Sequence, residues 1–212
     1  NNLIIKYCNE FKVPYSIAYG VAATESGFNC DAVNPSGAKG VFQILTDFSK
    51  KEGYNRPGLN PVEQNIFWGI KYLRELYDKY GQWAIAAMVY CTKPHEFENK
   101  IQSAVKVKFE ADKDTWPQYF KRHNINAITL YSRKYFRLGG SHPVQYPFYN
   151  LALAEIGEGI MRGKIKKDNL PDLVSPDIFR EVCRLYPQVK ARIIRKIGVA
   201  RTNEIFRRLN VE

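Results

Sequence analysis

The feature that most constrains this chain is a stretch without any charged side chain, which covers residues 13–24. Its apolar residues recur at helical spacing and form one continuous stripe. These residues are Ile17, Ala18, Val21 and Ala22. The spacing predicts a helix over residues 14–26 that is buried nearly all round. Glu25 is the first charge after the stretch, and it extends the apolar stripe instead of opposing it.

A glutamate in that position has two interpretations. A carboxyl group on a buried face is expensive to ionise, because burial disfavours its charged form. A general acid that works near neutral pH needs this property, which makes Glu25 a candidate catalytic acid. The alternative is a glutamate that reaches solvent at the helix end or caps a neighbouring backbone. Periodicity alone does not separate the two.

The rest of the chain is helical in pattern and has no convincing pair of strands, so we expect an all-α fold. A one-faced helix is expected over 3–11, and residues 29–43 predict a long surface loop. The clearest helix is Pro61–Tyr80, with Asn60 as its N-cap and Gly81 as its C-terminal stop. Further helices are expected over 83–90, 95–107, 117–137, 148–162, 177–186 and 189–209, with breaks at 139–143 and 169–171.

Several motifs stand in a recognisable order. Glu-Ser-Gly-Phe at 25–28 is followed by Ala-Val-Asn-Pro-Ser-Gly-Ala-Lys-Gly-Val-Phe-Gln-Ile at 32–44. The later motifs are Asn65-Ile66, Gly69, Tyr72-Leu73 and the run Ala86-Ala87-Met88-Val89-Tyr90. Together they closely resemble the soluble lytic transglycosylase family over about residues 13–94.

The resemblance implies a lysozyme-like α fold with Glu25 as a catalytic acid in a deep groove. It also implies a substrate, the glycan strands of peptidoglycan, and a reaction that uses no cofactor. In that family one glutamate protonates the oxygen between N-acetylmuramic acid and N-acetylglucosamine, and the substrate's N-acetyl group assists. The glutamate then takes a proton from the C6 hydroxyl, and a 1,6-anhydro ring closes. This is a substrate-assisted exception to the two-carboxylate scheme.

The resemblance also implies roles for five further positions. Gln43 is expected to hydrogen-bond the sugar, and Phe42 to form a wall for the sugar ring. Tyr90 is expected to orient the carboxyl of the acid through its hydroxyl. Ser26 fits a loop-anchoring role as well as a catalytic one, and Asn34 offers a polar contact.

The sequence departs from the family after Tyr90, where the usual Asn-x-Gly is replaced by Cys91-Thr92-Lys93. The change affects the expected subsite but not the acid. Two alternatives stay open. Hydrolysis of the same bond, as in goose-type lysozymes, is favoured if Asp31 or Asp47 folds near the acid. A glycan-binding structural component of a secretion, conjugation or phage-entry machine is the second.

Charge divides the chain unevenly, and the net charge is +11. Residues 1–109 hold 13 Lys or Arg against 10 Asp or Glu, whereas residues 110–212 hold 19 against 11. We expect a lytic transglycosylase domain over 1–112 and a basic helical region over 113–212. Residues 193–209 have the spacing of a helix-turn-helix, which leaves nucleic acid as an alternative partner. We favour an extension that completes the fold or docks to anionic wall or to a partner protein.

The scattered cysteines and histidines show no metal-ligand spacing, so we expect no metal site. They are Cys8, Cys30, Cys91, Cys183, His95, His123 and His142. No run approaches the ~20 apolar residues that a membrane-spanning helix needs. The first residues do not read as a signal peptide, and a targeting segment removed beforehand would not be visible. The expected location is the cell envelope or periplasm, the extracellular space or a virion.

Overall fold

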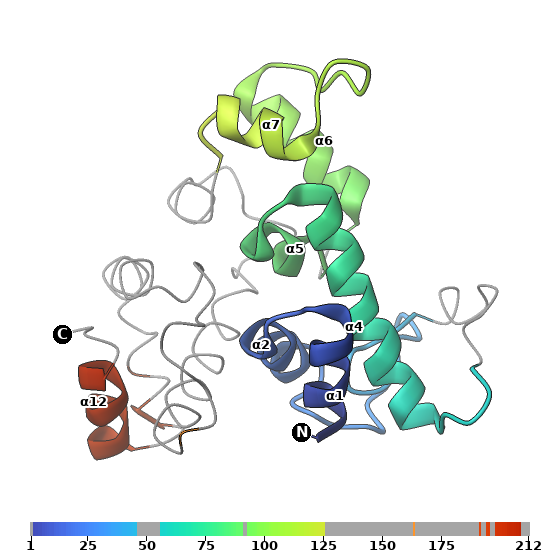
Figure 1. Ribbon diagram of the computed structural model, residues 1–212, viewed down its shortest axis with the longest axis vertical. Helices are drawn as coiled ribbons and strands as arrows, with labels where there is room; N and C mark the ends of the chain where they lie inside the picture. Colours follow the sequence, from blue (N-terminus) through green and yellow to red (C-terminus); the bar gives the residue numbers. More distant parts are fainter. Residues whose placement is uncertain are drawn as a thin grey trace.

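The computed structural model describes residues 2–45, 56–90, 93–125, 163, 191, 194–195 and 198–208 (Figure 1). Strand pairing in these ranges is limited to two isolated antiparallel bridges, Val33 with Lys39 and Lys39 with Ile44. The all-α prediction is confirmed. The helices are α1 Asn2–Phe11, α2 Tyr15–Glu25, α4 Pro61–Tyr80, α5 Trp83–Tyr90, α6 Pro94–Val105, α7 Trp116–Arg122 and α12 Val199–Arg208.

Helix α4 is the longest of the described helices and packs against α1, α5 and α7, and its predicted ends are confirmed. The Asn60 side chain accepts a hydrogen bond from the Glu63 backbone N–H at 2.9 Å, and Pro61 occupies the first turn. Gly81 adopts a left-handed conformation, with φ 71°, and its N–H donates to the Tyr77 carbonyl. Both ends therefore use the capping chemistry that their residue types favour. Helices α1 and α5 pack along α4, and α7 contacts it as well (Figure 1).

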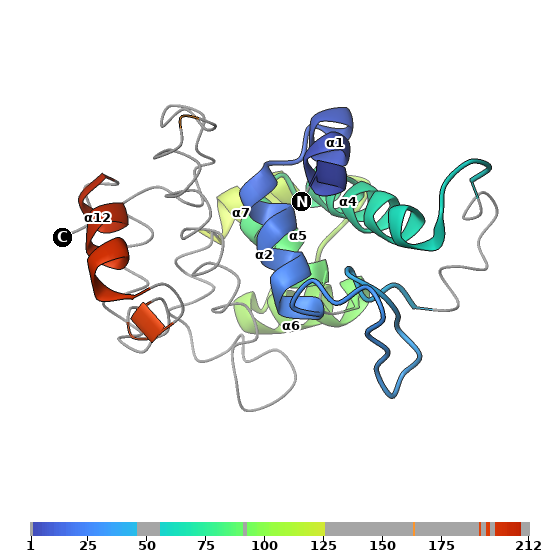
Figure 2. The same cartoon turned by 90° about the horizontal axis from the view of Figure 1, so that it is seen from below.

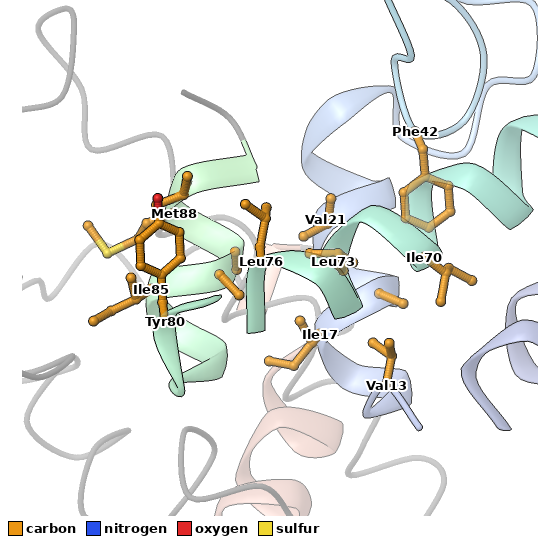
Figure 3. Close-up of a cluster of buried hydrophobic side chains, with 14 of the residues drawn as sticks. Val13, Ile17, Val21, Phe42, Ile70, Leu73, Leu76, Tyr80, Ile85 and Met88 are labelled. Carbon is orange, nitrogen blue, oxygen red and sulfur yellow. The ribbon is translucent and has the colours of Figure 1, made fainter. Parts of the chain in front are cut away.

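The uncharged stretch forms α2, and its predicted stripe is buried. Figure 3 shows Ile17 and Val21 of α2 close to Leu73 and Leu76 of α4. These side chains belong to one buried core, to which α1 and α5 also contribute. The helix stops because Gly27 follows in a left-handed conformation, with φ 62°.

A second part of the core gathers aromatic rings from α4, α6 and α7. Tyr80, Phe97, Trp116 and Phe120 form this aromatic cluster, with ring centroids 5.5 to 6.5 Å apart in the contacting pairs. Such spacings are typical of edge-to-face and offset pairs. The hydroxyl of Tyr80 donates to Glu98 Oε1 at 2.7 Å, so its polar end is also satisfied.

Three expectations for the helices need correction. The helix expected over 95–107 is α6, which ends at Val105 because Lys106 is left-handed, with φ 56°. Among the described residues, the helix expected over 117–137 is α7, which ends at Arg122 before the left-handed Asn124; residues 126–137 lie outside the described part of the chain. The helix expected over 189–209 is interrupted at Gly198, with φ 84°, and α12 begins at the next residue.

Other expectations lie outside the described residues. These are the helices over 148–162 and 177–186 and the breaks at 139–143 and 169–171. Among the described helices, none combines the length and apolar character that crossing a membrane requires.

Candidate active site

Glu25 is the last residue of α2, and its side chain is half-buried. The next residue, Ser26, closes the helix with its backbone N–H on the Ala22 carbonyl at 3.2 Å. Because the helix ends here, Glu25 stands where the buried core meets the following loop. The role of Glu25 as the catalytic acid stays a prediction.

The signature loop, residues 29–45, folds back on itself through its own backbone. The Asn34 side chain accepts a hydrogen bond from the Ala38 N–H at 2.9 Å, which closes a tight turn. Farther along, Lys39 and Ile44 exchange two backbone hydrogen bonds. Asn34, expected to contact substrate, is thus placed as a turn-forming residue.

The sequence predicted a surface loop for residues 29–43, and this is correct only for its first part. The later part turns inward, because Ala38, Val41, Phe42 and Ile44 are buried. Apolar side chains alternate with turn formers here, and burying them outweighs the loop composition. Figure 2 shows the loop leaving the end of α2.

Three side chains from different helices anchor the buried part of the loop, and we call them the loop-anchoring residues. Ser26, at the end of α2, donates from its hydroxyl to the Val41 carbonyl at 2.9 Å. Asn65 of α4 accepts from the Phe42 N–H and donates to the Lys39 carbonyl, both at 2.8 Å. Tyr90 of α5 donates to the Phe42 carbonyl at 2.8 Å.

Phe42 lies beneath the loop and has 0% of its surface exposed. Figure 3 shows its ring directed onto α4, near Ile70. The Phe42 ring can pack against α4 because residue 69 is glycine. A Cβ atom there would lie 2.3 Å from Phe42 Cγ, far inside any real contact distance. Phe42 therefore supports the loop in this structure, and its ring does not present the wall for a sugar that we expected.

Gln43 follows directly and has an unusual backbone, with φ 46°. A side chain other than glycine in this region costs of order 1–3 kcal/mol, and such residues gather at functional sites. Its side-chain Nε2 donates to the carbonyls of Gly40 at 2.9 Å and Ala32 at 3.2 Å. No hydrogen bond to its Oε1 is found among the described residues. Within the described part of the chain, the amide is thus held through its nitrogen.

The structure brings most of the predicted residues to one place. Ser26, Phe42 and Tyr90 are joined through the loop backbone, with Glu25 and Gln43 next to them in sequence. Sequence reasoning assigned no role to Asn65, which is 5% exposed. A polar residue on the otherwise apolar face of α4 was the available signal, because buried polar groups need partners.

The tyrosines near the loop lie in a dry environment. Burial raises the pKa of Tyr72, and the nearby Glu75 carboxylate adds to the effect. The ring of Tyr72 lies 5.4 Å from that of Tyr90. The phenol of Tyr72 is therefore a neutral hydrogen-bonding group at physiological pH.

Other chemistry-bearing side chains lie elsewhere. Burial raises the pKa of the Cys8 thiol to about 12, while Cys30 is exposed, and both are free thiols. Within the described ranges no three His, Cys, Asp or Glu side chains gather as metal ligands would. A pocket of about 590 Å³ lies on the α1 side of the loop, lined among others by Leu3, Phe28 and Ile66. The predicted site residues are absent from its lining.

The model of the transglycosylase SLT domain family matches residues 2–113, more than half of the chain. The chain belongs to this family. The match contains α1, α2, α4, α5 and α6 and the whole signature loop, so the anchored loop beside Glu25 is part of the SLT domain.

Curated relatives of this SLT domain are longer proteins. The soluble lytic murein transglycosylases of two Escherichia coli strains are each 33% identical to the chain over 90 residues. The alignment covers 38% of this chain and 14% of each relative, so the chain spans a small part of their length. A comparison with solved structures found no match.

Proposed function

We propose that this protein is a peptidoglycan lytic transglycosylase that cleaves the β-1,4 bond between N-acetylmuramic acid and N-acetylglucosamine. Membership of the SLT domain family supports the proposal, as does the name of the curated relatives, soluble lytic murein transglycosylase. The observation that carries it is the direct attachment of the signature loop to the end of the Glu25 helix through Ser26. This contact brings the loop and the candidate acid to one site.

Glu25 acts as the single acid and base of the reaction. Its carboxyl proton passes to the glycosidic oxygen as the bond to C1 of N-acetylmuramic acid breaks. The N-acetyl group of the same sugar stabilises the cation at C1. The carboxylate then takes the proton of the C6 hydroxyl, whose oxygen bonds to C1 and closes the 1,6-anhydro ring. The bonds balance without water or a cofactor.

The neighbouring residues orient the sugar. Gln43 is the proposed substrate contact, because its Nε2 is held by the loop backbone and its Oε1 accepts no hydrogen bond within the described chain. Oε1 is suited to accept from a sugar hydroxyl or an N-acetyl N–H. Ser26, Phe42 and Tyr90 act by holding the loop in which Gln43 lies. A direct contact of the Tyr90 hydroxyl with the Glu25 carboxyl stays a prediction.

Residues 1–112 form the catalytic domain in this proposal, and residues 113–212 form a basic helical region. Its excess of Lys and Arg favours polyanionic partners, of which anionic wall polymers are the ones next to the substrate. Because the proposed substrate is peptidoglycan, we expect the protein to act in the cell envelope. A partner protein of a wall-crossing machine and nucleic acid are the remaining candidates for the basic region.

The test is digestion of purified peptidoglycan followed by mass spectrometry of the products, with Glu25→Gln as the inactive variant. Anhydro-muramyl ends that disappear in the variant are the expected result. The matched control is Glu10→Gln, the same change at an exposed position of α1, which should cleave like the wild type.

Each other outcome assigns a different function. Reducing ends that disappear in Glu25→Gln would make the protein a hydrolase acting at the same bond. Absence of cleavage by the wild type on several wall types would contradict the enzymatic proposal and favour a glycan-binding component. Equal cleavage by Glu25→Gln and the wild type would remove Glu25 from the mechanism.

A further inference from the structure

Asn65 is a buried polar residue, and both ends of its amide bind the backbone of the signature loop. Its Oδ1 accepts the Phe42 N–H and its Nδ2 donates to the Lys39 carbonyl, each at 2.8 Å. These two backbone groups bracket Gly40 and Val41, so one rigid amide fixes a short arc of chain from both sides. Only 5% of the residue is exposed, so water does not compete effectively for these bonds.

The backbone approaches Asn65 more closely than a side chain at position 40 would permit. A Cβ atom on Gly40 would lie 2.7 Å from Asn65 Cγ, and Gly40 also has a positive φ of 73°. The glycine and the asparagine therefore form a matched pair. This contact attaches the arc to α4, the central helix of the domain, and leaves it little freedom to shift.

Gln43 depends on this arc for its position. Gln43 directly follows Phe42 and has a strained backbone, with φ 46°. Its Nε2 donates to the carbonyl of Gly40, which lies inside the arc that Asn65 holds. Ser26 attaches the same arc to the helix that ends in Glu25. A shift of the arc would move Gln43 relative to Glu25, although Asn65 itself need touch neither the substrate nor the acid.

We propose that Asn65 is a positioning residue of the transglycosylase site, which aligns Gln43 with Glu25 through the backbone of residues 39–42. The inference rests on the proposed function for its effect on catalysis. Misplacing a reacting or orienting group by about 1 Å costs on the order of 100-fold in rate. Asn65 therefore contributes to turnover more than to glycan affinity.

The first experiment compares Asn65→Leu with a control at the N-cap of the same helix. Leucine has a similar size and removes both hydrogen bonds. Asn60→Ala removes the N-cap of α4, which also destabilises the helix but lies away from the arc. Turnover of soluble glycan strands is measured well below the unfolding temperature of each variant. Glycan affinity is measured for each in a Glu25→Gln background, which prevents cleavage.

The second experiment measures how firmly the loop backbone is held, and it does not depend on enzymatic activity. Amide hydrogen exchange is followed at Phe42 and its neighbours in the wild type and in each variant. Asn65→Asp keeps an oxygen that accepts the Phe42 N–H and loses the donor to the Lys39 carbonyl. It replaces the leucine variant in both experiments if that variant fails to fold. Its exchange and turnover should lie between those of the wild type and the leucine variant.

We expect Asn65→Leu to lose about 100-fold in turnover, with a smaller loss of affinity and faster exchange confined to the loop. Asn60→Ala should keep wild-type turnover while folded. Turnover of a folded Asn65 variant within about threefold of Asn60→Ala would overturn the proposal. So would unchanged exchange at Phe42. If the wild type cleaves no glycan, the proposed function fails instead, and the exchange data alone decide whether Asn65 holds the loop.

Discussion

The signature loop and the aromatic cluster lie against different parts of α4 and are held by different forces. Beside the first half of α4, the side chains of Asn65, Ser26 and Tyr90 bind the loop backbone through directional hydrogen bonds. At its C-terminal end, Tyr80 packs among rings of α6 and α7. Hydrogen bonds to backbone fix where an atom lies, whereas ring packing fills volume. The comparison predicts that changes in the loop affect the proposed catalysis more than stability, and that changes in the cluster do the reverse.

Phe120→Ala tests the cluster and carries the largest expected effect on stability. The ring is fully buried against Tyr80, Phe97 and Trp116, so truncation should cost about 3–5 kcal/mol in the free energy of unfolding. Urea denaturation would measure the loss. Cleavage by the folded protein at low temperature should stay near the wild-type rate. A loss of turnover as large as that of a loop variant would contradict the comparison.

Gly69→Ala tests the support beneath the loop. Alanine in a helix interior usually stabilises by about 1 kcal/mol over glycine. Here the added Cβ would lie 2.3 Å from the Phe42 ring, so overpacking should win and cost about 1–3 kcal/mol net. Turnover should also fall, because Phe42 precedes Gln43.

Adding Phe42→Leu to Gly69→Ala supplies the control. If the clash causes the loss, the double variant should be more stable than the sum of the single changes predicts. Additive stabilities would show that Gly69 acts in another way.

Tyr90→Phe removes one loop anchor without changing packing. The hydroxyl donates to the Phe42 carbonyl at 2.8 Å, and its loss should cost about 1 kcal/mol. Turnover should fall by more than this change in stability alone explains. The control is Tyr77→Phe, since the half-buried Tyr77 ring stacks on Trp83 at 4.0 Å and donates no hydrogen bond within the described ranges. Equal behaviour of the two variants would remove Tyr90 from loop positioning.

Glu63→Gln carries the smallest expected effect and concerns neither the loop nor the cluster. The hydrogen bond from Lys6, followed by that from Tyr7, holds the pKa of Glu63 below its ordinary value. A lowered folded-state pKa gives stability that is present above the ordinary value and is lost as the pH falls through the folded value. Thermal unfolding should show a wild-type advantage near neutral pH that disappears in acid. A constant difference at all pH values would exclude the ion pair as its cause.

Much of the fold could be predicted because its determinants are local. The ends of α4 follow from Asn60 and Gly81, and the burial of α2 follows from a helix period without charges. The end of α7 was missed, because a left-handed Asn124 carries no strong sequence signal. The candidate site was predicted as a set of residue types, and most of them lie together in the structure.

The sequence by itself determined the ends of α4, the burial of α2 and which residue is the candidate acid, because capping, periodicity and the family motifs depend on residues close together in the chain. Tertiary structure decided what the signature loop does. It buried Phe42 in the space left by Gly69, and it paired Asn65 with backbone groups more than 20 positions earlier. Turn-forming residues specify that a chain bends. Groups from other helices specify where the bent chain lies, because residues far apart in the sequence meet only in the packed structure.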